Sequence, residues 1–219
     1  MSLPAVRSPK VPQLSVVNLA ARQRMLSQRM ILQTLLAADG RADMLAAAKQ
    51  SYQLFCDSHA ELMQTVQHME AHQAQLIRQT YNGPQGVGPV IERFMQHMRT
   101  ALDHATRQSP LLPRAVDELV ASTDSVLGAL NTATTAFDQI ARHKEDQLMK
   151  ELTHIVADIQ SVAREAKVIT FNAQVIAARA GEHGRGFAVV ANVLSGITSE
   201  IDRQSKKAME LTERTRLAA

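Results

Sequence analysis

Three arginines lie close together in an early segment that is otherwise apolar. They are Arg22, Arg24 and Arg29, and the sequence contains no acidic residue before Asp39. The apolar residues around them are Val16, Leu19, Leu26 and Met30. An arginine in the interior of a helical bundle needs a partner, because an unpaired buried charge costs several kcal/mol. A bound oxyanion suits the planar guanidinium. Otherwise the side chains reach water or pair with Asp or Glu of another helix, an interpretation that stays open for Arg24 and is favoured for Arg22 and Arg29.

Histidines and one cysteine are the candidate metal ligands. His68 and His72 are four residues apart, which is the spacing of two ligands on one helix face. The other donors are Cys56, His59, His97 and His104. The residues between them fix no third ligand, so we predict neither a metal nor another cofactor. The sequence places no recognisable base beside a nucleophile and contains no paired carboxylates, so an enzyme is the least favoured class.

The composition favours a folded, all-α protein. Of 219 residues 45% are hydrophobic and 21% charged, whereas aromatic residues make up 3% and Trp is absent. Such a chain is rich in helix formers and poor in strand formers. The single Cys56 excludes an internal disulfide, and no apolar run approaches the roughly 20 residues of a transmembrane helix, so we expect a cytoplasmic chain without a membrane segment. The net charge of +3 is mild and its basic residues are interleaved with acidic ones, so nucleic acid is not an expected partner.

Glycine and proline divide the chain into five expected helices. They gather at Gly40 and at residues 83–89, 110–113 and 181–186. The helices between them should cover residues 13–39, 41–80, 89–108, 112–180 and 187–216. The first four have the lengths and short connections of an up-down four-helix bundle. We therefore predict a flexible tail at 1–12, a four-helix bundle at 13–141 and a hairpin at 142–219.

The fourth expected helix carries the clearest repeat in the sequence. Its apolar residues follow strict 4-3 spacing, which is typical of a coiled-coil seam: Leu148, Leu152, Ile155, Ile159, Val162, Ala166, Ile169, Ala173 and Ile176. The returning helix has a matching series: Phe187, Val190, Leu194, Ile197 and Ile201. The two arms should therefore fold back as an antiparallel hairpin. Upstream, an apolar series with the same spacing runs from Val120 to Ala141. Joining it to the seam through Lys144 requires two consecutive steps of four residues, which is a stutter in the heptad repeat. The stutter marks either a phase change between two independently packed bundles or a point where movement of the sensor passes into the signalling coil.

The turn between the arms carries a recognisable motif. A helix precedes its glycines, which excludes a phosphate-binding loop that follows a strand. The motif consists of Asn172-Ala173, Ala177-Ala178-Arg179-Ala180-Gly181-Glu182 and Gly184-Arg185-Gly186-Phe187-Ala188-Val189-Val190-Ala191. It resembles the hairpin tip of methyl-accepting chemotaxis proteins over about residues 150–215. The resemblance implies a dimeric four-helix bundle that gathers into trimers of dimers and contacts a histidine autokinase and its coupling protein.

The same resemblance implies which residues bind these partners. Asn172 and Arg179 correspond to contacts between dimers. Glu182, Phe187 and Val189 correspond to positions at or near the kinase-coupling surface. We therefore take these five residues as the candidate partner-binding set.

Three departures from the family pattern bear on this interpretation. Ile176 and Val193 stand where the family usually has Glu, and Arg164 stands where an aromatic contact of the trimer is common. The arms are also short, and no segment carries the paired Glu or Gln residues that would be methylated. The hairpin fold is expected to carry over, whereas trimer formation and kinase control are left open.

The early arginine-rich segment has a resemblance of its own. Residues 18–30 resemble the first helix of the sensor bundle in type IV pilus chemotaxis transducers and in nitrate-sensing receptors. In the nitrate sensors an Arg from each subunit clasps the anion between paired first helices, and that Arg corresponds to Arg24. Ala21 replaces a glycine of that family, so the ligand need not be nitrate. The ligand-binding residues expected from this resemblance are Arg24, Asn18, Ala21 and Gln28.

Two functions from different classes follow. The first is a chemoreceptor-like signalling protein that forms a homodimer, binds a small ligand such as an anion, and signals through the hairpin to a chemotaxis histidine kinase and coupling protein. The second is a ligand-binding or dimerising scaffold with a degenerate tip and no kinase control. The motif residues favour the first, and Ile176 and Val193 favour the second.

Overall fold

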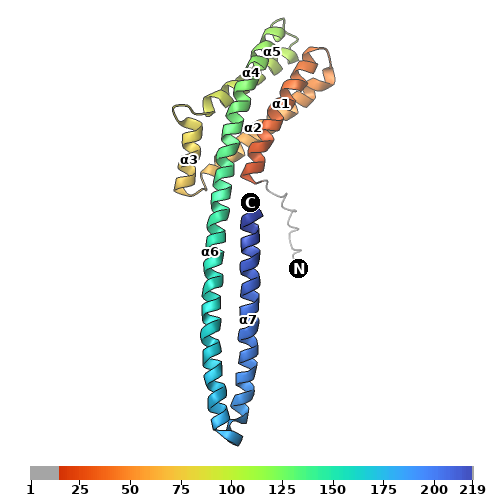
Figure 1. Ribbon diagram of the computed structural model, residues 1–219. Helices are drawn as coiled ribbons and strands as arrows, with labels where there is room; N and C mark the ends of the chain where they lie inside the picture. Colours follow the sequence, from red (N-terminus) through yellow and green to blue (C-terminus); the bar gives the residue numbers. More distant parts are fainter. Residues whose placement is uncertain (1–14, 219) are drawn as a thin grey trace, which may run out of the picture. The chain divides into compact units, whose positions relative to one another are not determined.

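A computed structural model describes residues 15–218, and every regular element in that range is helical (Figure 1). The expected tail at 1–12 lies outside the described residues. The elements are α1 (Val16–Ala38), α2 (Ala42–Val66), α3 (Ala71–Asn82), α4 (Gly88–Thr106), α5 (Leu112–Ala121), α6 (Thr123–Arg179), the short 3₁₀ helix η1 (Gly181–Gly184) and α7 (Arg185–Ala218). The predicted all-α class is confirmed. None of the described helices combines the length and apolar content needed to cross a bilayer.

The chain divides into two compact units between Ala141 and Arg142. Unit 1 comprises the helices up to that boundary, and unit 2 comprises the remainder of α6 with η1 and α7. Helix α6 therefore contributes to both units, and it stays helical and exposed through residues 142–146, where the stutter lies. We describe each unit by itself.

Unit 1 is a helical bundle built around large buried side chains. The rings of Phe55 on α2 and Phe94 on α4 meet edge to face, with centroids 5.9 Å apart. Phe137 on α6 is fully buried in the same core. Local signals start the helices, since the Ser15 hydroxyl accepts a hydrogen bond from the backbone N–H of Asn18, and α4 and α5 each carry a proline in the first turn.

Two helices expected to be continuous are interrupted. The segment expected at 41–80 breaks between Val66 and Ala71, although the apolar spacing continues across the break and no glycine or proline marks it. The segment expected at 112–180 breaks at Ser122, whose hydroxyl donates to the Leu119 carbonyl at 2.6 Å. Backbone bonding nevertheless passes through this point, because the Val126 N–H donates to the Ser122 carbonyl. Hydroxyl side chains that compete for backbone carbonyls bend helices in this way.

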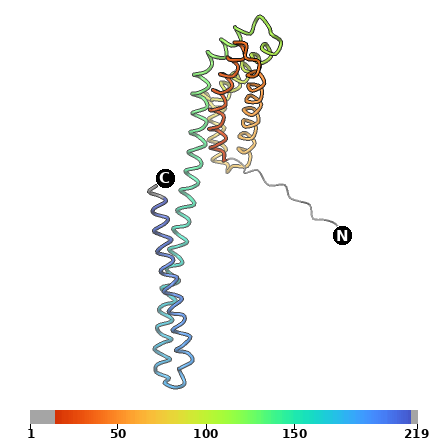
Figure 2. The backbone as a smooth tube through the Cα atoms, turned by 90° about the vertical axis from the view of Figure 1, so that its right-hand side faces the viewer, coloured from red at the N-terminus to blue at the C-terminus, as the bar shows by residue number. Residues whose placement is uncertain are grey.

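Unit 2 is an antiparallel hairpin of α6 and α7 (Figure 2). The side chains buried between the arms are small or hydroxylated and recur every seven residues on each arm. We call this set the inner seam: Val156, Ala163, Thr170, Ala177, Ala191, Thr198, Ser205 and Thr212. The buried threonine hydroxyls are satisfied locally, as when Thr170 donates to the carbonyl of Ala166 at 2.7 Å. Small side chains allow the two helices to approach closely.

The large apolar residues expected to face the partner arm lie outside this contact. We call them the outer seam: Leu148, Leu152, Ile155, Ile159, Val162, Ile169, Ile176, Phe187, Val190, Leu194, Ile197 and Ile201. Their exposed fractions run from 36% to 75%. The hairpin was predicted correctly, but the face that closes it was not. The reason is that alanine and threonine at seven-residue spacing give a weaker apolar signal than leucine and isoleucine.

The turn of the hairpin depends on glycine at two positions. Gly181 has a positive φ of 58°, which glycine adopts without strain. Gly184 is buried, and a Cβ built on it would collide with the carbonyl oxygen of Ala177. The turn therefore brings the start of α7 directly against the end of α6.

We expect Gly184→Ala to destabilise unit 2 by about 2 kcal/mol or more, because the added methyl group meets backbone that cannot yield. Gly186→Ala is the matched control, since a Cβ there meets nothing within 4 Å and should stabilise the helix by about 0.5–1 kcal/mol. Thermal unfolding followed by circular dichroism compares the two variants. Equal melting temperatures would contradict the close approach at Gly184.

Candidate functional site

The five candidate residues of the hairpin tip all lie on its surface. Asn172, Arg179 and Glu182 are exposed. Phe187 is 75% exposed and Val189 is 64% exposed. An apolar aromatic ring this open to water is energetically unfavourable unless a partner covers it. The tip therefore has the character of a contact surface.

Polar contacts hold the tip and the two arms in register. The Glu182 carboxylate pairs with the Arg185 guanidinium at 2.6 Å across the turn. The Gln174 side-chain amide donates to the side-chain oxygen of Asn192 at 2.9 Å and joins the two arms. These groups are exposed, so each contact contributes at most about 1 kcal/mol and mainly fixes geometry.

Arg164, one of the departures from the family pattern, lies in the electrostatic environment of Asp202 on the opposite arm. A hydrogen bond from Lys206 lowers the pKa of Asp202 below its ordinary value, and the nearby charges of Lys167 and Arg164 act in the same direction. Arg164 thus supports an attraction between the arms of one hairpin.

The four candidate ligand residues lie along one side of α1. Arg24, Asn18 and Gln28 are exposed, and Ala21 is half-buried. The Arg24 guanidinium donates to the side-chain oxygen of Asn131 on α6 at 2.9 Å. This set therefore faces the surface of unit 1. The sequence interpretation left open whether Arg24 holds an anion or instead reaches water or another side chain, and the structure gives it Asn131 as a partner.

The interior of unit 1 contains a different set of polar residues. Arg22 donates from Nη2 to the Ser58 hydroxyl at 2.7 Å. Gln23, the next residue of α1, is 1% exposed. On α2, the His59 ring lies 6.0 Å from the ring of Tyr81 on α3, centroid to centroid. Sequence reasoning had assigned Arg22 a structural role and passed over Gln23, although Gln23 follows Leu19 by four residues and precedes Met30 by seven, on the apolar face of the helix.

Burial sets the protonation of the two interior rings. Desolvation lowers the pKa of His59 below 6.5, and the negative charge of Glu92 partly opposes this effect. Desolvation also raises the pKa of Tyr81 to about 12. At neutral pH, therefore, His59 is a neutral imidazole and Tyr81 retains its proton as a hydrogen-bond donor.

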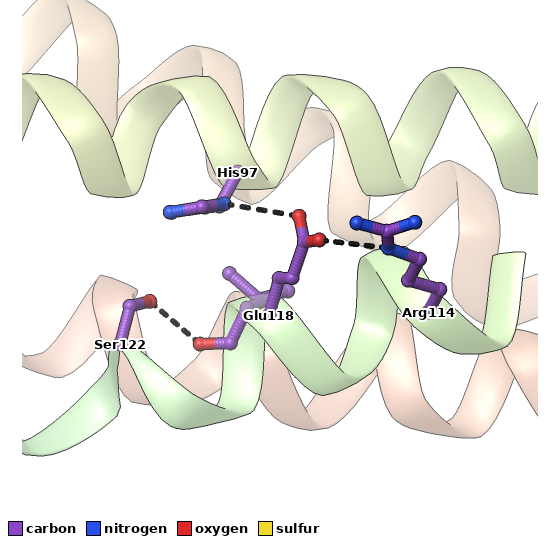
Figure 3. A network of polar contacts seen from close by, with 5 residues as sticks. His97, Arg114, Glu118 and Ser122 are labelled. Atoms are coloured by element: carbon purple, nitrogen blue, oxygen red, sulfur yellow. Dashed lines mark hydrogen bonds and ion pairs between the residues drawn. The ribbon is translucent and has the colours of Figure 1, made fainter. Parts of the chain in front are cut away.

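The histidines considered as metal ligands have other surroundings. His97 on α4 points its Nδ1 toward the Glu118 carboxylate on α5 at 3.9 Å, and Arg114 also pairs with Glu118, at 3.1 Å (Figure 3). In the same view the Ser122 hydroxyl donates a hydrogen bond to the backbone carbonyl of Leu119 at 2.6 Å. Within residues 15–218 no group of three or more His, Cys, Asp or Glu is arranged to hold a metal ion.

The chain is similar to a family of known proteins. A family described as "Methyl-accepting chemotaxis protein (MCP) signalling domain" matches residues 47–216. The chain is 26% identical over 116 residues to the biofilm dispersion protein BdlA of Pseudomonas aeruginosa, covering 53% of the chain and 25% of that protein. It is 30% identical over 128 residues to the methyl-accepting chemotaxis protein McpA of Bacillus subtilis, covering 52% of the chain and 19% of that protein.

A third relative is the methyl-accepting chemotaxis protein TlpQ of Pseudomonas aeruginosa, 36% identical over 90 residues, which are 41% of the chain and 12% of that protein. The chain thus matches a quarter or less of the length of these relatives. No solved structure matches it.

The lowered pKa of His59 predicts how stability depends on pH. The folded state binds fewer protons at this site than the unfolded state, so the free energy of unfolding should fall as pH drops below about 6.5. His59→Gln should remove part of this decrease, because Gln does not titrate. Melting temperatures between about pH 7.5 and pH 5 measure it. The exposed His68 provides the control variant His68→Gln, and an equal pH profile for both variants would contradict a buried neutral His59.

Proposed function

The chain belongs to the methyl-accepting chemotaxis protein signalling-domain family, and we propose that it relays the binding of a small ligand in unit 1 to a chemotaxis histidine kinase and its coupling protein through the hairpin of unit 2. The kinase partners are cytoplasmic, so this function requires the tip to face the cytoplasm. The observation that carries the proposal is the open apolar tip, with Phe187 and Val189 exposed beside the fixed turn.

The chemistry of the tip supports protein recognition. Phe187 and Val189 offer apolar area, and the Glu182–Arg185 pair frames it with charge. Apolar anchors with a polar rim are the usual composition of a protein interface. In this proposal Asn172 and Arg179 contact neighbouring receptor dimers, whereas Glu182, Phe187 and Val189 contact the kinase and coupling protein.

We infer a homodimer from the outer seam. Apart from Phe187, which lies at the tip and stays open for partner binding in this proposal, its exposed side chains follow a heptad repeat on both arms, and a second hairpin in parallel orientation would cover them with an equivalent surface. The inner seam is already occupied within one chain, so the second copy adds to the hairpin and does not replace either arm. Four helices around one apolar core would result.

For ligand sensing, we propose that Arg24 takes part in a small-anion site on the outer side of α1, together with Asn18, Ala21 and Gln28. The exposed guanidinium supports this, because its contact with the neutral side chain of Asn131 leaves its charge uncompensated by that partner. A paired α1 from a second chain would supply the other half of the site. Nitrate and nitrite are the first anions to consider.

A scaffold without kinase control is the second candidate. It is favoured by Ile176 and Val193, which are 67% and 58% exposed and apolar where the family usually has Glu. These residues would strengthen hairpin pairing at the expense of polar contacts between dimers. The scaffold and the receptor share the dimer and differ only in partner binding.

Binding to the coupling protein separates the two candidates. A pull-down with the purified chemotaxis coupling protein should retain the full chain, and Phe187→Ala should weaken binding about 10-fold or more, equivalent to about 1.4 kcal/mol for an interface anchor. Val168→Ala is the control, because Val168 is 61% exposed but lies away from the turn. Absence of binding by the wild-type chain would leave only the scaffold.

The outer seam predicts the oligomeric state independently of any partner. Ile159→Asp places an unpaired charge in the dimer core and should weaken the dimer by about 3 kcal/mol, which is more than 100-fold in Kd. Lys150→Asp, an exposed charge on the same helix, should leave it intact. Light scattering at micromolar concentration measures both. A wild-type monomer at that concentration would refute the homodimer.

A further inference from the structure

Unit 1 contains a concentration of buried polar atoms that no described residue satisfies. They are Nε of Arg22, both amide atoms of Gln23, Nδ1 of His59 and the hydroxyl of Tyr81. Among the described residues, these four contain all the buried side-chain nitrogen and oxygen atoms that lack a hydrogen-bond partner. Buried polar groups in folded proteins are paired as a rule, so their clustering needs a physical explanation.

Two contacts place three of these residues against or on α2. The Ser58 hydroxyl donates to the Leu54 carbonyl and accepts from Arg22, so it has no proton left for another acceptor. His59 is the next residue of α2, and its ring packs against Tyr81. Arg22 of α1 and Tyr81 of α3 therefore contact consecutive residues of α2.

Gln23 adds the strongest single indication. It directly follows Arg22, is 1% exposed, and has neither an acceptor for its amide N–H groups nor a donor for its oxygen. A leucine in the same place would fill the core without desolvating an amide, so the glutamine has an energetic cost that a bound group would offset.

We propose that Arg22, Gln23, His59 and Tyr81 form an interior site for a small oxyanion or carboxylate in unit 1. The ligand class follows from the donors, which comprise a permanent guanidinium charge, an amide and a tyrosine hydroxyl. Neutral His59 adds one ring N–H without a second charge. Glu92 is the acidic group that acts on His59, and its charge favours a singly charged ligand.

This site is distinct from the Arg24 surface. Arg24 is exposed on the outer side of α1 and bonds to Asn131, whereas Gln23 faces the core. The inference deepens the proposed function, because it rests on unit 1 being the sensor. It requires only one chain, and the Arg24 site requires two.

Thermal shift of the full chain tests the site with sodium nitrate and sodium acetate as probes, against sodium chloride at equal ionic strength. Either probe should raise the wild-type melting temperature by several degrees at saturation. Gln23→Leu and Tyr81→Phe should abolish most of that rise, whereas Arg29→Ala, which changes an exposed arginine of the same helix, should preserve it. Without a probe, Gln23→Leu should raise the melting temperature, because it replaces an unpaired buried amide with an apolar group of similar size.

Three results would overturn the interior site. The first is no shift with either probe, which leaves buried water as the partner of these atoms. The second is a shift that survives Gln23→Leu and Tyr81→Phe but is lost in Arg24→Ala. The third is a Gln23→Leu variant that melts lower than wild type, which assigns the amide a structural role. Coupling-protein binding is scored separately, so failure of kinase coupling with a retained shift would overturn the proposed relay and leave the site standing.

Discussion

The small residues between the two arms of the hairpin determine much of what this molecule can do. Alanine, threonine and serine on the inner seam let α6 and α7 approach closely, and the threonine hydroxyls are satisfied within their own helices. With that face occupied, the leucine, isoleucine and valine side chains of the outer seam remain open to water. At roughly 25 cal/mol per Å² of apolar surface, covering them is a large driving force for association. The proposed homodimer rests on this difference between the two faces of the hairpin.

Much of the fold follows from local rules. The 4-3 spacing from Leu148 to Ile176 identified the coiled coil, and the glycines from 181 to 186 located its turn. The inner seam was missed because Ala163 or Thr170 is as common on a solvated helix face as in a core. The break after Val66 has no glycine or proline, and the one at Ser122 depends on a single hydroxyl bond. Tertiary packing decides whether a helix continues or breaks at such positions.

The ligand region was harder to predict than the hairpin. The arginine cluster pointed to α1, but Arg22 and Arg24 are two residues apart and therefore face nearly opposite directions on a helix. Only the packing of α2 and α6 against α1 determines that Arg22 meets Ser58 while Arg24 turns outward to Asn131. Gln23 carries no charge and so attracted no attention, although its burial without a partner distinguishes the interior from an ordinary apolar core.

Disulfide cross-linking of the hairpin faces tests the central claim most directly. In a Cys56→Ser background, Ile159→Cys introduces a thiol on the outer seam and Ala163→Cys introduces one on the inner seam. If the outer seam pairs two parallel hairpins, mild oxidation should give a covalent dimer through position 159 and little through position 163. Equal cross-linking at both positions, or none at position 159, would contradict the account.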